Sequence, residues 1–290
     1  MMPEKSSRPD NEAKRFWIAA GLLCTAVVFG GGGVAYGLNN AIVQWAALAV
    51  LAISLSSFTA FWKKAPLSFR LLCAASIALP LFQLVPLPAV VWQALPGREL
   101  ITQSLQVAGV DPGWRSLTVN SARTLVAGLA LLVPFALIVI AHDMSRRRIQ
   151  HLGWVIVCLG LVNFLWGIPQ VLSQGASAIP YQENPMPGVL FGSFANRNST
   201  AIFLVTCLIL ALHLDVPAKL ARSATIVRAI AATTLVVGVI LTQSRTGMAL
   251  LALPIGLTAW RRISAKSLKF DGKLIALSGV AVVGLISAAA

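Results

Sequence analysis

The chain has 290 residues, of which 57% are apolar and only 11% are charged, and its mean hydropathy is +0.81. A soluble domain carries about a quarter charged residues, so this composition excludes an ordinary soluble protein, a disordered chain and a small disulfide-stapled fold. The formal charge is +14; in a membrane protein it must first be compared with the enrichment of Lys and Arg in cytoplasmic loops. We therefore predict an all-α, polytopic membrane helix bundle.

Nine apolar runs approach the length of about 20 residues that a helix needs to cross a bilayer. In chain order, the predicted spans are residues 16–36, 41–62, 69–91, 122–141, 152–172, 199–214, 226–243, 246–260 and 274–290. Four consecutive glycines, Gly30 to Gly33, weaken the outer half of the first span as a helix. Small residues also allow helices in lipid to pack closely.

The spans divide the chain into three parts. Residues 1–15 form a cytoplasmic tail, residues 16–141 hold the N-terminal spans with an outer loop at 92–121, and residues 152–290 form a second membrane region. With the N-terminus inside, 18 of the 23 basic residues fall in inner segments. The outer segments hold five arginines: Arg98, Arg115, Arg123, Arg197 and Arg245. This bias predicts an N-in, C-out topology, so the positive charge reports orientation and no nucleic-acid partner is expected.

Cysteine and histidine give no sign of a metal centre. The four cysteines fall within predicted spans without metal-ligand spacing, so we expect no metal, no cofactor and no disulfide framework. All three histidines lie at the inner ends of spans. Outward acid–base chemistry is then limited to Glu99, Asp111 and Glu183, and the general base is not identified.

The first candidate anion site lies where the outer segment 173–198 meets the next span. Asn196 and Asn198 are plausible helix caps, and Arg197 lies between them. A helix N-terminus offers free N–H groups to phosphate, and an arginine adds a planar group suited to bidentate binding. The alternative, an ordinary capped helix whose arginine faces water, remains open.

The second candidate lies in the turn at residues 243–247. Only 32 residues separate Arg228 from Arg261, which leaves about 16 residues or roughly 24 Å for each of two helices. Because the hydrocarbon core is about 30 Å thick, we expect Ser244 and Arg245 to lie below the outer surface, facing a cavity lined by protein or water. The alternative is that Arg245 extends to the outer headgroups.

With Arg123 at the outer start of the fourth span, these residues place three arginines at the outer mouth of the bundle. Few acids lie at that level. The arrangement predicts a site for an anionic lipid headgroup, and pyrophosphate is the natural candidate.

Two segments in this order resemble a known family. PGVLFGSFANRNSTAIFL (residues 187–204), followed by LTQSRTGMALL (residues 241–251), is similar to the O-antigen ligase and polymerase superfamily. Two earlier segments, QLVPLPAVVWQALPGRE (83–99) and RSLTVNSARTLVAGL (115–129), resemble its exopolysaccharide-polymerase branch. Residues 152–290 then correspond to the ligase-like membrane region.

The resemblance implies a metal-independent, inverting, membrane-embedded glycosyltransferase of the bacterial inner membrane. Such an enzyme moves a glycan from undecaprenyl pyrophosphate to a hydroxyl acceptor, either the lipid A core or a growing glycan, on the periplasmic face. It implies that Arg197 and Arg245 bind the pyrophosphate, that Asn196, Asn198 and Ser244 support them, and that Arg123 is a weaker match. Ligase and polymerase activity are not distinguished, and membrane lipids are expected as further partners.

The family also carries a large outer loop with a histidine after a further span, which this chain lacks. We therefore expect a fragment of a longer reading frame rather than a truncated homologue.

Two other functions remain open. One is a transporter or flippase for an anionic lipid-linked substrate, although such proteins usually place ionisable groups near the midplane. The other is a membrane subunit without catalytic activity.

Overall fold

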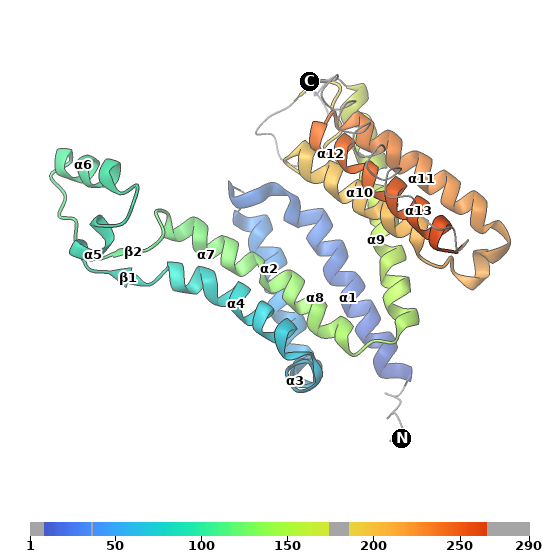
Figure 1. Ribbon diagram of the computed structural model, residues 1–290, viewed down its shortest axis with the longest axis horizontal. Helices are drawn as coiled ribbons and strands as arrows, with labels where there is room; N and C mark the ends of the chain where they lie inside the picture. The colour runs from blue at the N-terminus through green and yellow to red at the C-terminus, as the bar shows by residue number, and fades with distance from the viewer. Residues whose placement is uncertain (1–8, 36, 174–185, 266–290) are drawn as a thin grey trace. The chain divides into compact units, whose positions relative to one another are not determined.

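The computed structural model describes residues 9–35, 37–173 and 186–265, and these residues are mostly helical (Figure 1). The chain divides into two compact units. The first comprises Met1–Phe16, Ala26–Gly33 and Ser145–Ala290, and the second comprises Trp17–Thr25 and Val34–Met144. Each unit is described by itself below.

The N-terminal helix α1 (Pro9–Phe29) contributes residues to both units. It ends where the glycine run begins, and the chain continues as the 3-10 helix η1 (Gly30–Ala35). The predicted weakening of this helix is confirmed, because glycine loses more conformational freedom in a helix than any other residue.

The second unit contains five longer helices. They are α2 (Gly37–Ile53), α3 (Leu55–Lys64), α4 (Leu67–Gln83), α7 (Ser121–Ala130) and α8 (Leu132–His142). The predicted span 41–62 is a bent pair, because α2 and α3 meet at an angle of 76°. The bend lies at the buried Ser54, whose backbone N–H bonds to the carbonyl of Leu51, three residues back.

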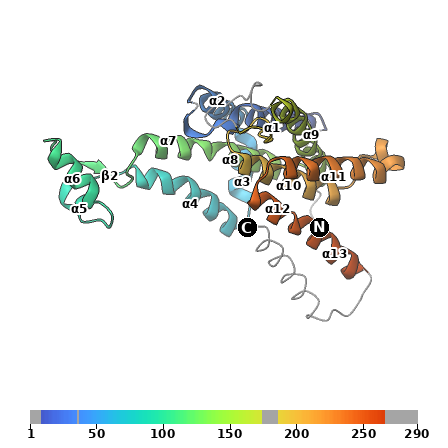
Figure 2. The ribbon, with the colours of Figure 1, turned by 90° about the horizontal axis from the view of Figure 1, so that it is seen from above.

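The predicted span 69–91 ends earlier than expected, at Gln83. Pro86 and Pro88 follow, and proline cannot donate to a continuing helix. The segment 92–121, predicted to be an outer loop, is ordered around a small antiparallel sheet of β1 (Pro86–Leu87) and β2 (Arg115–Ser116), with α5 (Ala89–Gln93) and α6 (Glu99–Val107). Figure 2 shows this group at the far end of the α4–α7 pair.

Trp92 anchors the group formed by β1, β2, α5 and α6. Its side chain is fully buried, its indole N–H donates to the carbonyl of Gly113 at 3.0 Å, and the guanidinium of Arg115 lies 5.9 Å from its ring centroid. Arg98 is also buried and donates to the carbonyl of Leu117. Two of the five arginines that the sequence predicts on the outer side are therefore used in holding this group together.

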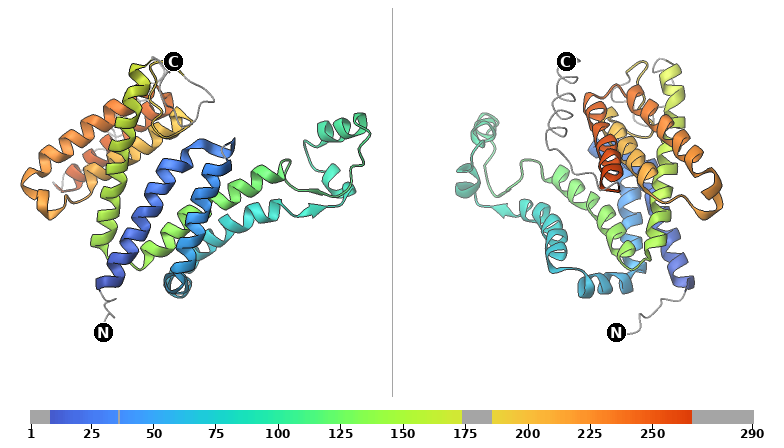
Figure 3. Two further views of the ribbon diagram at one scale, coloured as in Figure 1. Left: turned by 180° about the vertical axis from the view of Figure 1, so that it is seen from behind. Right: turned by 45° about the vertical axis from the view of Figure 1, so that its right-hand side comes forward.

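The first unit contains the longest helix, α9 (Arg146–Leu172), and then α10 (Arg197–His213), η2 (Ala218–Ser223), α11 (Ala224–Leu241), α12 (Arg245–Leu250) and α13 (Ala252–Ala265). Helices α10 and α11 pack along each other, and α9 crosses them (Figure 3). Their core contains ten buried residues: Val157, Leu190, Leu204, Val205, Cys207, Leu208, Ala211, Ala231, Leu235 and Val239.

Two predicted spans are interrupted at the same distance before a proline. The span 122–141 is broken at Leu131, three residues before Pro134, and the span 246–260 is broken at Leu251, three residues before Pro254. Proline has no N–H to bond the carbonyl four residues back, and its ring crowds that carbonyl. At both breaks the backbone N–H of the leucine donates to the carbonyl three residues back, of Gly128 for Leu131 and of Met248 for Leu251.

Among the described residues, four helices are long and apolar enough to cross a membrane, or five if the α2–α3 pair is one span. They overlap the predicted spans 16–36, 122–141, 152–172 and 226–243, while α4 and α10 are shorter apolar helices. The predicted span 274–290 lies outside the described residues. Large apolar side chains on α11 face outward, including Ile226 and Ile230, each more than 60% exposed. Such exposure suits lipid rather than water.

Gly160 lets α9 and α10 approach closely. A Cβ added at Gly160 would lie 2.6 Å from the sulfur and 2.9 Å from the Cβ of Cys207. We expect Gly160→Ala to lower the free energy of unfolding by about 1–3 kcal/mol, as overpacking in a filled core does. Thermal unfolding in detergent, followed by tryptophan fluorescence, measures the change.

The matched control is Gly256→Ala in α13, where an added Cβ meets no atom within 4 Å. This variant should melt at or slightly above the wild-type temperature, because alanine is the better helix former. Equal melting of the two variants would contradict the close approach at Gly160.

Candidate functional site

The segment before α10 is non-helical yet buried. Val189, Leu190 and Phe191 are at most 4% exposed, and Gly192 and Ser193 are also buried. Inside an apolar bundle the backbone N–H and C=O groups of such a segment need partners, since no water or lipid group supplies them. The backbone N–H of Leu190 donates to the carbonyl of Leu241 in α11 at 2.9 Å.

Gln170, near the end of α9, supplies three of these hydrogen bonds. Its Oε1 accepts from the backbone N–H of Phe191 at 3.1 Å and of Gly192 at 2.8 Å, and its Nε2 donates to the carbonyl of Gly192 at 2.8 Å. The side chain is only 1% exposed. One buried amide thus replaces the pairing that a helix or sheet would give to this turn.

Ser193 connects the segment to the N-terminal helix. Asn163 Nδ2 donates to Ser193 Oγ at 2.6 Å, and Ser193 Oγ donates to the carbonyl of Val27 at 2.7 Å. The backbone N–H of Ala195 donates to the carbonyl of Gly31 at 2.9 Å. A Cβ at Gly31 would collide with the Ser193 carbonyl, so the glycine run is needed for close approach.

Of the two asparagines predicted to cap α10, Asn196 is the cap and Asn198 is not. The Asn196 side chain is the N-cap and accepts from the backbone N–H of Asn198 at 2.8 Å. Asn198 lies within the first helical turn and has a different role. Thr200, fully buried, donates to the carbonyl of Phe191 at 2.7 Å, which fixes the start of α10 against the buried segment.

Ser244 joins the start of α12 to the start of α10. Its Oγ accepts from the backbone N–H of Gly247 at 3.0 Å, as an N-cap does, and donates to Asn198 Oδ1 at 2.7 Å. The preceding residue, Gln243, has a φ of 50°, which turns the chain sharply after α11. A Cβ at Gly247 would collide with Ala201, so α12 meets α10 closely here.

The Ser244–Asn198 bond joins the two helix starts that carry Arg197 and Arg245. Each arginine is the first helical residue after its cap, Asn196 or Ser244. Arg197 is half-buried and Arg245 is exposed, and neither guanidinium has a hydrogen-bond or ion-pair partner within the described part of the chain. Two cations beside the N-terminus of α10 form a favourable environment for an anion.

Five of the six predicted site residues therefore gather in the first unit. The sixth, Arg123, belongs to the second unit, where it is exposed in the first turn of α7; the Asn120 side chain accepts from its backbone N–H. Its role in the same site stays a prediction.

Sequence reasoning missed the groups that hold the buried segment. Gln170 and Asn163 are buried on α9 and lie seven residues apart, which puts them on one face of the helix two turns apart. Two buried amides on one face of an otherwise apolar membrane helix are a readable signal, because such groups need partners. Their partners, which lie 20 to 30 residues further along the chain, have no local signal.

The acid–base chemistry of the site is not assigned to a residue. Glu99 and Asp111 are exposed in the second unit, and Glu183 falls outside the described residues. Within the described ranges, no group of three or more His, Cys, Asp or Glu side chains gathers in a way that could hold a metal ion. What this arrangement can do is bind an anion.

No protein-family model, curated protein or solved structure matches the chain.

Replacing Gln170 with leucine should release the buried segment. The change keeps the side chain's size but leaves the N–H groups of Phe191 and Gly192 and the carbonyl of Gly192 unpaired. We expect unfolding free energy to fall by about 2–5 kcal/mol, since each buried unsatisfied group costs about 1–3 kcal/mol. Thermal unfolding and the rate of tryptic cleavage after Arg197 measure the effect.

Gln106→Leu is the matched control, because this glutamine is exposed on α6 and no hydrogen bond of its side chain is found within the described residues. It should leave both measurements near wild type. A Gln170→Leu protein as stable as this control would contradict the role of Gln170 in holding the buried segment.

Proposed function

We propose that the protein binds the pyrophosphate of a polyprenyl-linked glycan at the joined starts of α10 and α12 and takes part in transferring that glycan to a hydroxyl acceptor. This is the function of an O-antigen ligase or a surface-polysaccharide polymerase. The observation that carries the proposal is the Ser244–Asn198 hydrogen bond, because it places Arg197 and Arg245 together with their guanidinium groups unpaired among the described residues.

The physical argument concerns the leaving group. When the glycan departs, negative charge develops on the pyrophosphate oxygens, and planar guanidinium groups stabilise it through paired hydrogen bonds. Such donors act most strongly where water is scarce and their positions are fixed in advance. Here Arg197 follows the N-cap Asn196 at the start of α10, and the hydrogen bond from Thr200 to the Phe191 carbonyl holds that helix start against the buried segment.

The proposal includes the orientation in a bacterial inner membrane, with nine spans, the N-terminus inside and the arginine pair on the periplasmic side. Arg197 begins α10 and Arg245 begins α12, whereas Arg228 lies near the start of α11 and Arg261 near the end of α13. Antiparallel α10 and α11 thus separate two arginines at one end from two at the other, which supports opposite sides of the membrane for the two pairs.

Binding of a soluble prenyl pyrophosphate tests the site. Purified protein in detergent is titrated with farnesyl pyrophosphate, and thermophoresis gives the dissociation constant. We expect Arg197→Gln and Arg245→Gln each to weaken binding about 10- to 100-fold, because a hydrogen bond to a charged group contributes about 1.5–3 kcal/mol. Arg222→Gln, an exposed arginine in η2, should bind as wild type does.

Farnesyl monophosphate should bind more weakly than the pyrophosphate, since it offers fewer oxygens to two arginines. Wild-type affinity in both arginine variants would contradict the proposed site.

Transfer itself is tested in proteoliposomes, where a labelled lipid-linked glycan should pass to an added acceptor glycan. Movement of the label between leaflets without transfer would instead indicate a flippase. Binding without either reaction would indicate a non-catalytic subunit.

A further inference from the structure

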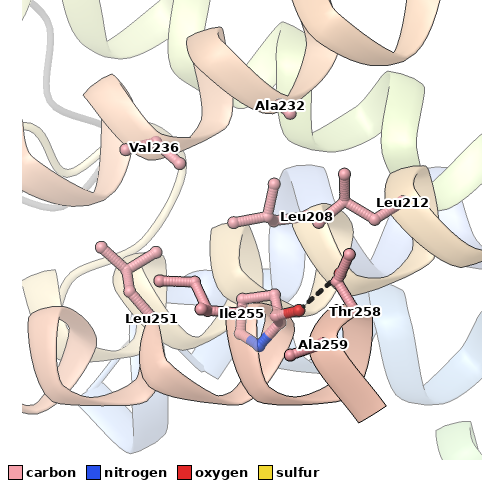
Figure 4. Close-up of a pocket in the computed structure, with 9 residues that line it drawn as sticks. Leu208, Leu212, Ala232, Val236, Leu251, Ile255, Thr258 and Ala259 are labelled. Carbon is pink, nitrogen blue, oxygen red and sulfur yellow. Dashed lines mark hydrogen bonds between the residues drawn. The ribbon is translucent and has the colours of Figure 1, made fainter. Parts of the chain in front are cut away.

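Helices α10, α11 and α13 enclose an apolar groove of about 520 Å³. Figure 4 shows its side chains converging from the three helices. Its lining residues are Leu208, Leu212, Ala232, Val236, Leu251, Pro254, Ile255, Thr258 and Ala259. The one hydroxyl among them, on Thr258, donates to the carbonyl of Pro254 at 2.7 Å, so the groove presents almost no polar surface.

A second hollow, about 340 Å³, adjoins this groove and is basic. It shares Leu212 and Thr258 with the groove, and its other described lining residues are His213, Thr225, Arg228 and Arg261. None of these residues carries a negative charge. Because Leu212 and Thr258 line both, the basic hollow and the apolar groove adjoin, and together they are called the depression.

The cations of the hollow keep donor capacity that the protein does not use. Arg228 donates through Nη2 to the carbonyl of Leu214 at 2.8 Å, and Arg261 donates through Nη1 to the carbonyl of His213 at 3.4 Å. Arg228 Nε and His213 Nε2 are buried and have no hydrogen-bond partner among the described residues. The guanidinium N–H groups of Arg228 and Arg261 that make no hydrogen bond within the described residues can donate to a ligand's oxygen atoms.

Asp215, two residues after His213, has hydrogen-bond partners on α9. Asp215 Oδ2 accepts from Gln150 Nε2 at 2.9 Å, and its carbonyl accepts from the indole N–H of Trp154 at 2.8 Å. No ion pair joins a carboxylate to Arg228 or Arg261 within the described ranges. The hollow thus keeps its positive charge.

The basic hollow is distinct from the Arg197–Arg245 site. His213 is the last residue of α10 and Arg197 the first, and the sixteen steps between them correspond to about 24 Å along the helix. The positive charge at this end agrees with the cytoplasmic side that the sequence predicts for Arg228 and Arg261.

From this juxtaposition we propose that the depression binds an anionic phospholipid, with the phosphate between Arg228 and Arg261 and an acyl chain in the groove. Two observations favour a phospholipid over a free anion or a neutral lipid. A free phosphate would leave the apolar groove without a ligand, and an uncharged headgroup would leave Arg228 and Arg261 without an anion. Basic pockets between membrane helices on the cytoplasmic side are suited to acidic headgroups. The inference does not depend on glycan transfer, because it uses other residues.

Native mass spectrometry of the full, delipidated chain tests the inference. The protein is titrated with phosphatidylglycerol or with phosphatidylcholine carrying the same palmitoyl and oleoyl chains. We expect the first tightly bound phosphatidylglycerol to have about tenfold or greater advantage over phosphatidylcholine, from two arginines at the headgroup. The double variant Arg228→Gln/Arg261→Gln should lose that advantage, and Arg222→Gln should keep it.

A second pair of variants tests the acyl chain's position. Val236→Trp fills the groove and should abolish the tight phosphatidylglycerol, whereas Val237→Trp, whose side chain is 41% exposed and does not line the groove, should retain it. Unchanged melting temperatures confirm that all variants fold; if Val236→Trp does not fold, Ala232→Leu replaces it.

Three outcomes would overturn the proposal. Equal affinity for the two lipids would remove the role of charge. Retained binding in Val236→Trp would show that the groove is filled otherwise, for example by residues of the chain itself. Displacement of the lipid by inorganic phosphate at equal concentration would make the hollow a free-anion site.

Discussion

Buried backbone needs hydrogen-bond partners, and in the first unit this requirement is concentrated on the non-helical segment before α10. A helix satisfies its own N–H and C=O groups, whereas Leu190, Phe191 and Gly192 lie among α9, α10 and α11 without doing so. Gln170 and Thr200 supply the missing partners. Without these hydrogen bonds, burying the segment's polar backbone groups would cost free energy, and the start of α10 would not be held against the segment.

The candidate site follows from that fixed start. Asn196 caps α10 and Arg197 begins it, while Asn198 in the same turn accepts a hydrogen bond from the Ser244 hydroxyl. The second arginine is placed through this bond, because Ser244 is also the cap of α12 and Arg245 is the residue after it. A chain of neutral hydrogen bonds therefore positions two cations, and the cations themselves remain unpaired among the described residues.

Three glycines lie where segments of the first unit pack closely against each other. At Gly31, Gly160 and Gly247 an added Cβ would collide with Ser193, Cys207 or Ala201. Helices in lipid gain little from apolar burial alone, so close packing and hydrogen bonds carry much of their association. Helix α10, which α9 and α12 approach closely, also lines the depression with α11 and α13. The protein thus combines a tightly joined arginine site with an open, basic-and-apolar hollow.

The sequence by itself predicted the helical character, nine apolar runs of which four are described helices long enough to span, the cap at Asn196 and the weakening of the first helix at the glycine run. These depend on local properties: apolar length, capping side chains and backbone freedom. Breaks at Leu131 and Leu251 also have a local cause in the following prolines, although the runs alone indicated unbroken spans. The bend at Ser54 and the ordered group around Trp92 carried no comparably clear local signal.

Only the tertiary structure decided that the segment before α10 is buried, that Gln170 holds it and that Ser244 bonds to Asn198, 46 residues away in the chain. It also separated Arg123 into the other unit and joined Arg228 and Arg261 around one hollow. The reason is physical: a hydrogen bond between distant segments depends on how helices pack, and no pattern of neighbouring residues records that packing.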